Sequence, residues 1–339
     1  MKKFKIIFAV LIFSVSLFAG DVARKGTTGA DHLLIPVGAR GIATGGSMLA
    51  TLSGLESIYY NPAGLDRASG GGEAMFSYMS YLADINISYF AASTKMGDFG
   101  SLGFSLRSLD VGDIPVTTVE FPDGTGETYS PTYMTLGLTY SKVLTDRISV
   151  GANFKLITEE IVNTSASGFA IDFGVQYRFS ESLFLGASVK NIGTNMVYEG
   201  PDMEAATNIP GVAIGSKPGR YQVVAEEFQI PSYFELSIAY MYNFNEQNNL
   251  LLASTFTNNN SFEDDLKFGL EYSFMNTFFL RGGYSLLMEN TDDSIFGFAA
   301  GAGVNYDFGN ELGITVDYAF RDVQEFPEPN HIFTVKLGF

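Results

Sequence analysis

Residues 311–321 read ELGITVDYAFR, and residues 331–339 read HIFTVKLGF. In both stretches every second residue is apolar, and most of the residues between them are polar or small. A period of two is typical of a β-strand whose two faces meet different surroundings. We therefore expect two strands here, with Val316 on one face and Asp317 on the other.

The second of these stretches ends on an aromatic residue, Phe339. A strand with this ending resembles the assembly signal of bacterial outer-membrane β-barrels. The resemblance implies a location in the outer membrane of a diderm bacterium, with outer-membrane lipid and the barrel assembly machinery as partners. Phe339 is the candidate assembly signal.

The start of the chain has the layout of a secretory signal peptide, which we assign to residues 1–20. Lys2, Lys3 and Lys5 precede an apolar stretch, and the small pair Ala19-Gly20 ends the segment. A retained anchor is the alternative, but the stretch is short for crossing a bilayer. Because the chain has no cysteine, we expect neither a lipoprotein anchor nor disulfides.

The net charge of the chain limits the kinds of partner that it can attract electrostatically. The chain carries 20 Lys and Arg against 37 Asp and Glu, a formal net charge of −17, and three of the lysines belong to the signal peptide. So acidic a protein is not attracted to nucleic acid or to anionic lipid by its bulk charge. We expect no nucleic-acid partner.

Segments with alternating apolar residues follow one another from residue 72 to residue 339. A soluble β-sandwich is the alternative, but it buries one face of each sheet, whereas a barrel in lipid needs apolar residues outward on every strand. The chain has 30 Phe and 18 Tyr to cover such a surface. We predict an all-β fold, a 14-stranded antiparallel transmembrane β-barrel over residues 72–339. The expected strands are 72–80, 85–95, 98–109, 131–143, 147–159, 167–179, 182–193, 231–244, 247–257, 264–275, 277–288, 294–307, 311–321 and 331–339.

Connections between these strands alternate between tight turns and longer loops. Outer-membrane barrels have short periplasmic turns and longer external loops, so we expect both termini on the periplasmic side. The long loops carry most of the acidic residues. We read them as a solvated rim; bridging by divalent cations to lipopolysaccharide, or contact with a basic partner, is the alternative.

The barrel register assigns Val316 to the lipid face and Asp317 to the lumen. On this basis Val316→Arg should destabilise the barrel by about 2–4 kcal/mol, and Asp317→Asn should cost much less. Acidic and basic residues are mixed at the expected inward positions, which suggests ion pairs inside the barrel that rigidify its wall and hold water. These positions are Asp172, Glu235, Glu271, Asp317, Lys155, Lys190, Lys267, Arg281, Arg321 and Lys336.

Sequence motifs for catalysis, metals or cofactors are lacking, and we expect no enzyme activity, no cofactor and no metal site. The chain has two histidines and no cysteine, which makes a site of His/Cys type very improbable. We read His331 as a polar residue of the external rim. The glycines Gly297, Gly301 and Gly303 lie on an expected strand and open no helix, so they are no phosphate loop. As small inward residues they would leave space in the lumen.

Residues 21–71 differ from the barrel, being rich in glycine and small residues, and we name this segment the hatch. A lumen of fourteen strands is wide enough to conduct unless it is plugged, and the hatch is the candidate plug. We expect a short helix over residues 49–60 that stops at Asn61, because Pro62 biases Asn61 away from helical geometry. Ala63 and Gly64 would then permit close packing against the barrel wall. Asn61, Pro62, Ala63 and Gly64 form the candidate hatch motif.

Two stretches of the hatch, HLLIPVGAR at residues 32–40 and SIYYNPAGL at residues 57–65, together with Gly45-Gly46 between them, resemble the N-terminus of the PorV/PorQ family. That family is related to the FadL-type transporters of hydrophobic compounds. The resemblance implies a fourteen-stranded barrel with the N-terminal segment inside. It also implies one of two activities. A PorV-type barrel binds the C-terminal signal domains of proteins exported by type IX secretion, and a FadL-type barrel passes hydrophobic ligands.

The sequence keeps three function classes open. The first, which we favour, is a protein-binding or shuttle component linked to type IX-like secretion, with secreted cargo as partner. Aromatic residues of the long loops would supply its contact surface: Phe121, Tyr129, Tyr198, Tyr221 and Phe228. The second is transport of long-chain fatty acids or other hydrophobic small molecules, and the third is a structural barrel without selective traffic.

Overall fold

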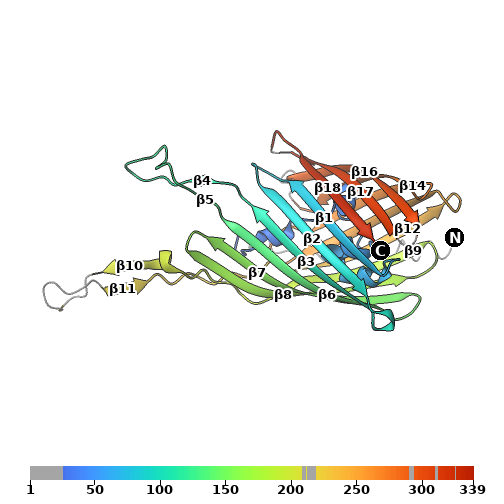
Figure 1. Cartoon of the computed structure of the whole chain (residues 1–339), viewed down its shortest axis with the longest axis horizontal. Helices are drawn as coiled ribbons and strands as arrows, with labels where there is room; N and C mark the ends of the chain where they lie inside the picture. Colours follow the sequence, from blue (N-terminus) through green and yellow to red (C-terminus); the bar gives the residue numbers. More distant parts are fainter. Residues whose placement is uncertain (1–25, 208–210, 212–218, 290–293, 310–311, 325) are drawn as a thin grey trace.

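The chain forms a closed β-barrel with its N-terminal segment inside, as seen in a computed structural model (Figure 1). The structure describes residues 26–207, 211, 219–289, 294–309, 312–324 and 326–339. The signal peptide assigned to residues 1–20 lies outside these ranges. No helix in the described part is long and apolar enough to cross a membrane.

Fourteen strands close the barrel, each antiparallel to both neighbours, and this confirms the predicted fold class. Every predicted strand has a counterpart whose ends differ from the prediction by at most three residues. The strands are β1 (Gly72–Ser80), β2 (Asn86–Lys95), β3 (Ser101–Asp110), β6 (Thr132–Val143), β7 (Ile148–Ile161), β8 (Thr164–Arg178), β9 (Leu183–Gly193), β12 (Tyr233–Asn243), β13 (Asn249–Asn259), β14 (Asp265–Phe274), β15 (Phe278–Leu287), β16 (Phe296–Gly309), β17 (Leu312–Val323) and β18 (Asn330–Gly338).

The alternation along each strand separates lipid-facing from lumen-facing side chains. On β17, Val316 is 46% exposed whereas Asp317 is 3% exposed. Phe169 and Phe173 of β8 likewise point outward, while Asp172 between them is buried. The predicted faces are therefore confirmed. In a membrane the outward apolar side chains contact hydrocarbon rather than water, which is why a period of two can run through every strand.

Two small hairpins lie in the longest loops and were not predicted, because their sequences do not alternate. One pairs β4 (Ile114–Pro115) with β5 (Thr128–Tyr129), and the other pairs β10 (Glu204–Thr207) with β11 (Gly219–Gln222). We name them the first and the second arm. Both extend beyond the barrel at the end opposite Phe339 (Figure 1).

The hatch consists of short helical pieces, η3 (Asp31–Leu34), α2 (Ala39–Ala43), η4 (Gly54–Glu56), α3 (Ser57–Tyr60) and η5 (Pro62–Arg67). The expected helix over residues 49–60 is wrong in its first half, since helical geometry begins only at Gly54. Gly54, the first residue of η4, has a φ of +69°, so right-handed helical geometry cannot continue from η4 back into residues 49–53. Helix α3 does end at Tyr60, and Asn61 is extended, as Pro62 led us to expect.

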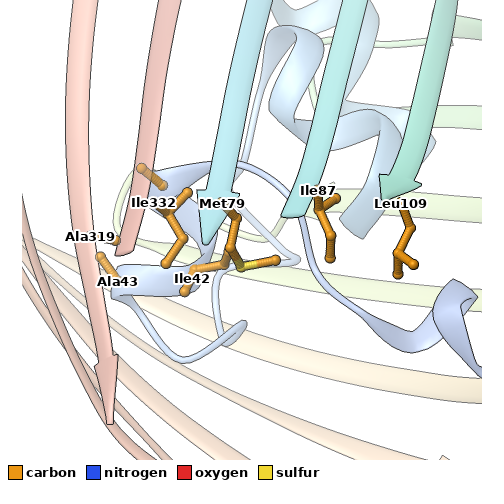
Figure 2. Close-up of a cluster of buried hydrophobic side chains, with 8 residues drawn as sticks. Ile42, Ala43, Met79, Ile87, Leu109, Ala319 and Ile332 are labelled. Atoms are coloured by element: carbon orange, nitrogen blue, oxygen red, sulfur yellow. The ribbon is translucent and has the colours of Figure 1, made fainter. Parts of the chain in front are cut away.

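Helix α2 seats one end of the hatch against the wall (Figure 2). Ile42 and Ala43 pack with Met79 of β1, Ala319 of β17 and Ile332 of β18, all of them buried. Burial of side chains as large as Ile42 or Met79 contributes about 1.5–3 kcal/mol each. This end of the hatch is therefore held by apolar packing.

The inward glycines of β16 do not leave empty space, contrary to our expectation. A Cβ on Gly301 would lie 2.6 Å from the Cβ of Ala43, and one on Gly303 would lie 1.9 Å from Oδ1 of Asp317. The room that these glycines provide is taken by α2 and by a buried carboxylate. Because these glycines have no side chain, α2 and the Asp317 carboxylate can lie close to the backbone of β16.

Candidate functional site

Asn61 fastens the hatch to the wall of the barrel. Its side-chain nitrogen donates to the carbonyl oxygens of Val175 on β8 at 3.0 Å and of Ala187 on β9 at 3.4 Å. It also donates to the Leu49 carbonyl within the hatch at 3.3 Å, while its oxygen accepts from the Ala63 N–H at 3.2 Å. Because Asn61 is fully buried, these bonds satisfy polar atoms that water cannot reach. One side chain thus joins two strands to two parts of the hatch.

The wall opposite this motif is built from glycines. A Cβ on Gly174 would lie 1.9 Å from Oδ1 of Asn61, and one on Gly151 would lie 2.4 Å from the carbonyl oxygen of Pro62. The hydroxyl of Ser141 donates to the Ala63 carbonyl at 3.1 Å. Asn61, Pro62 and Ala63 therefore contact the wall closely, whereas among these three residues the sequence led us to expect such contact of Ala63 alone.

Gly64 packs against other residues of the hatch, and not against the barrel wall as we expected. A Cβ at this position would meet the Leu52 carbonyl oxygen at 2.2 Å and the Ser57 side chain at 2.7 Å. Both groups belong to the hatch. The small size of Gly64 lets two turns of the hatch approach each other, and the contact with the barrel wall is made by the three residues before it.

Two charged residues that follow the motif extend the attachment toward the end of the barrel at which Phe339 lies, and the sequence analysis missed both. Asp66 accepts from the Ser101 hydroxyl at 2.6 Å and from the Val143 N–H at 2.8 Å. The guanidinium of Arg67 donates to the Ser149 hydroxyl at 2.7 Å. Their position directly after an apolar turn was the available signal.

An ion-pair network holds helix α2. Arg40 donates through Nε and Nη2 to the two oxygens of Glu271, at 2.8 and 2.7 Å. Glu271 also accepts from Arg281 at 2.6 Å, and Arg281 in turn pairs with Asp317. The forked geometry of arginine suits such bidentate pairing with a carboxylate. The inward charges were expected to pair; the contribution of Arg40 from the hatch was not foreseen.

A second set of ion pairs runs along the inner face of the wall, over β7, β8, β9, β12 and β14, which lie close together in the barrel. Lys155 contacts Asp172 at 2.6 Å, and Glu235 accepts from both Lys190 and Lys267 at 3.1 Å. These five side chains are among those predicted to pair inside the barrel. Paired buried charges are costly to separate, so the network stiffens the wall on the side facing the hatch.

A small cavity remains between the hatch and this network. Its volume is about 30 Å³, which is room for about two water molecules. Residues of the hatch form one side, Leu33, Ile58 and Tyr59, and wall residues such as Arg107 and Lys190 form the other. Such a space admits neither an acyl chain nor a peptide.

The second arm is rooted in the hatch. Its base is bridged by main-chain bonds between Met196 and Phe228, and the same two residues pack on Ala30 and Leu33. Tyr198 also packs there and donates to the carboxylate of Glu159. Burial raises the pKa of the Tyr198 phenol above its ordinary value, and the bond to Glu159 raises it further.

The loop aromatics divide into two groups. Tyr198 and Phe228 lie partly buried at the root of the second arm, where they pack on the hatch, and their part in a contact surface stays a prediction. Phe121 on the first arm and Tyr221 on the second are 59% and 53% exposed. Tyr129 is half-buried on β5. The free aromatic surface is therefore concentrated along the projecting parts of the arms.

Phe339 lies at the seam where the barrel closes. Its carbonyl accepts from the N–H of Gly72 at 2.7 Å, and its own N–H donates to the Gly72 carbonyl at 2.9 Å. The aromatic ring is 57% exposed. The ring is accessible on the lipid face, as an assembly signal requires; that role stays a prediction.

The histidines take no part in a reactive cluster. His32 of the hatch contacts Glu159 at 3.2 Å, and His331 accepts from or donates to the Tyr318 hydroxyl at 2.8 Å. Within the described ranges, no three His, Cys, Asp or Glu side chains gather in a way that could hold a metal ion.

Comparison with known families gives one match that covers most of the chain. Residues 19–259 match the family model described as type IX secretion system protein PorV. Among curated proteins, no sequence matches this chain.

Several solved structures share the fold at low sequence identity. The toluene transporter TbuX of Ralstonia pickettii gives a TM-score of 0.57 at 13% identity, with 89% of this chain and 98% of that chain covered. The toluene transporter TodX of Pseudomonas putida gives 0.56 at 14% identity, covering 89% and 96%. A FadL homologue from Pseudomonas aeruginosa gives 0.52 at 12% identity, covering 90% and 98%. At these identities the likeness is one of fold.

Proposed function

This chain belongs to the family of the type IX secretion system protein PorV, and on that premise we propose that it binds secreted proteins at its two arms. The barrel would sit in the outer membrane with the arms on the external side, because longer loops of such barrels face outward. Enzymatic activity has no place in this proposal.

The observation that carries the proposal is the contrast between the lumen and the arms. The hatch is bonded to the wall through Asn61, Asp66 and Arg40, and the cavity beside it measures about 30 Å³. The arms instead present exposed aromatic residues, Phe121 and Tyr221. Exposed aromatic side chains on projecting loops are typical anchors for protein recognition.

Photo-crosslinking in the native host tests this proposal. A photoreactive phenylalanine analogue is placed at Phe121 or at Tyr221, and adducts are identified by mass spectrometry. The control site is Phe99, which is equally exposed at 58% but lies in a turn at the other end of the barrel. We expect adducts with exported proteins from both arm positions and none from Phe99. Adducts with lipid alone, or equal yields from all three positions, would contradict the proposal.

A second candidate function is transport of hydrophobic small molecules, which the fold shared with the toluene transporters favours. It requires the hatch to move, because the cavity of about 30 Å³ next to Arg107, Lys155 and Lys190 is too small for such a molecule. An uptake assay distinguishes protein binding from transport. It measures the entry of labelled toluene and of a labelled fatty acid into vesicles that contain the purified protein. Uptake above protein-free vesicles would support transport.

A further inference from the structure

Arg107 is a buried cation without a carboxylate partner among the described residues. It lies on β3 and is 6% exposed. Its guanidinium donates to the carbonyl of Ile35 at 3.1 Å and to the hydroxyl of Thr135 at 3.5 Å, both neutral groups. A buried charge that is matched only by neutral acceptors is costly. Arg107 also lines the cavity between the hatch and the wall.

The other charges around this cavity are already neutralised. Lys155 pairs with Asp172, and Lys190 pairs with Glu235 while lying over the ring of Tyr59 at 4.7 Å. Asp172 is the one carboxylate among the lining residues, against the three cations Arg107, Lys155 and Lys190. The cavity lining therefore carries one unpaired positive charge, that of the Arg107 guanidinium.

The cavity also contains a hydrogen-bond donor without an acceptor. Tyr89 is 5% exposed, lines the cavity, and its hydroxyl makes no hydrogen bond within the described part of the chain. The Ser105 hydroxyl lies near it, but the geometry between the two falls short of a hydrogen bond. Buried hydroxyls are nearly always satisfied, so the Tyr89 hydroxyl is available to donate to a group bound in the cavity.

Arg321 shows that an arginine in this lumen can be accommodated in another way. It too lies buried, at 9% exposure, without a carboxylate partner in the described ranges. Its guanidinium lies 3.9 Å from the centre of the Phe296 ring, a favourable cation–π position. No such aromatic contact exists for Arg107 among the described residues, which leaves the cavity as the place where its charge is balanced.

We propose that the cavity binds a small monovalent inorganic anion of halide size, with chloride as the natural occupant. Arg107 supplies the charge, and the hydroxyl of Tyr89 donates to the ion. A volume of about 30 Å³ suits a halide ion better than a carboxylate that carries a chain. Water fits and would satisfy hydrogen bonds, but it leaves the charge of Arg107 unbalanced.

The anion would strengthen the attachment of the hatch. Leu33, Ile58 and Tyr59 of the hatch line the same cavity, and Arg107 already holds the hatch carbonyl of Ile35. An ion that binds only when both sides are in place stabilises their contact by linkage. Chloride thereby favours the seated hatch, whatever the barrel binds at its arms.

Bromide provides a direct test, because its anomalous scattering locates it in crystals of the full-length mature protein. We expect a bromide peak in the cavity next to Arg107 in the wild type and in Arg321→Met, and none in Arg107→Met. The control removes a buried arginine of the same lumen that does not line the cavity. A cavity without a peak, or one filled by water alone, overturns the proposal.

Thermal unfolding in detergent provides the solution test, with chloride exchanged for gluconate at constant ionic strength and pH. The wild type and Arg321→Met should gain stability with chloride in a saturable manner, and Arg107→Met should not. If Arg107→Met does not fold, Tyr89→Phe replaces it. Loss of one hydrogen bond to a charged group should raise the chloride concentration at half-saturation about tenfold or more in Tyr89→Phe. The same chloride response in every variant, or binding at crystal concentration only, overturns the proposal.

Discussion

Asn61 and Gly174 meet at a single close contact that links the hatch to strand β8. A Cβ at position 174 would lie 1.9 Å from Oδ1 of Asn61, and Asn61 is held by bonds to three carbonyls. Neither partner can therefore give way without breaking hydrogen bonds. The fit of the hatch against the wall therefore depends on Gly174 as much as on Asn61.

We expect Gly174→Ala to destabilise the seated hatch by about 1–3 kcal/mol, the usual penalty for overpacking. Gly282→Ala is the matched control, since a Cβ there finds its nearest neighbour, Cγ of Leu270, at 3.9 Å. Thermal unfolding and single-channel recording check the effect. A control variant as unstable or as conductive as Gly174→Ala would contradict this reading.

Charge on the two faces of β17 gives a second prediction at the residue scale. Val316→Arg should still cost about 2–4 kcal/mol, because it exposes a charge to hydrocarbon. The structure changes our expectation for Asp317→Asn, since Asp317 pairs with the buried Arg281. Weakening a buried pair is costly, so the two variants should be comparable. Urea unfolding in lipid vesicles measures both; an Asp317→Asn variant as stable as wild type would argue against the pair.

At the scale of elements, the strands could be predicted and the path of the hatch could not. Backbone geometry imposes a period of two on every strand, so the fourteen segments are visible without any tertiary knowledge. The hatch has no period. Its key contacts join residues far apart, such as Arg40 and Glu271, which are 231 positions apart. Gly64 was misassigned for the same reason: sequence shows that a residue is small, and only the fold shows which neighbour needs the space.

Removal of residues 29–66 should turn a nearly closed barrel into a steady pore. The hatch contributes packing and side-chain bonds to the wall but no strand of the barrel. Planar bilayer recordings compare the two proteins, with heat-modifiable mobility on gels to show that each barrel is folded. After the deletion the side chains of Lys155, Asp172, Glu235 and Lys267 should face water, and their mixed charges should make the pore only weakly ion-selective. Equal conductance before and after deletion would rule out the hatch as a plug.

At the scale of the whole molecule, closure of the barrel depends on β1 and β18. The register runs from Glu73 opposite Gly338 to Ser80 opposite His331, and Gly72 and Phe339 add two main-chain bonds beyond it. The ring of Phe339 contributes little to this pairing because it points outward. Recognition by the assembly machinery and stability of the finished barrel can therefore be separated experimentally.

Phe339→Ala should slow insertion into the outer membrane while leaving the stability of inserted protein nearly unchanged, because both main-chain bonds remain. Deletion of Phe339 should slow insertion as well and also lower stability, since the bonds to Gly72 are lost. Pulse-labelling followed by surface protease protection measures insertion, and heat-modifiable mobility measures stability. Normal insertion of both variants would remove Phe339 as an assembly signal.

The pairing of β1 with β18 also fixes an order of events in time. The hatch and β1 leave the ribosome long before β18, and the hatch fits against wall glycines with no room to spare. A hatch threaded into a finished barrel would have to pass these contacts, so it must already be in place when the seam shuts. Any chain cut short before residue 330 lacks the partner of β1 and keeps two unpaired edges. An unpaired strand edge can pair with other chains, so the barrel loses this exposed edge only once β18 has been made and has paired with β1.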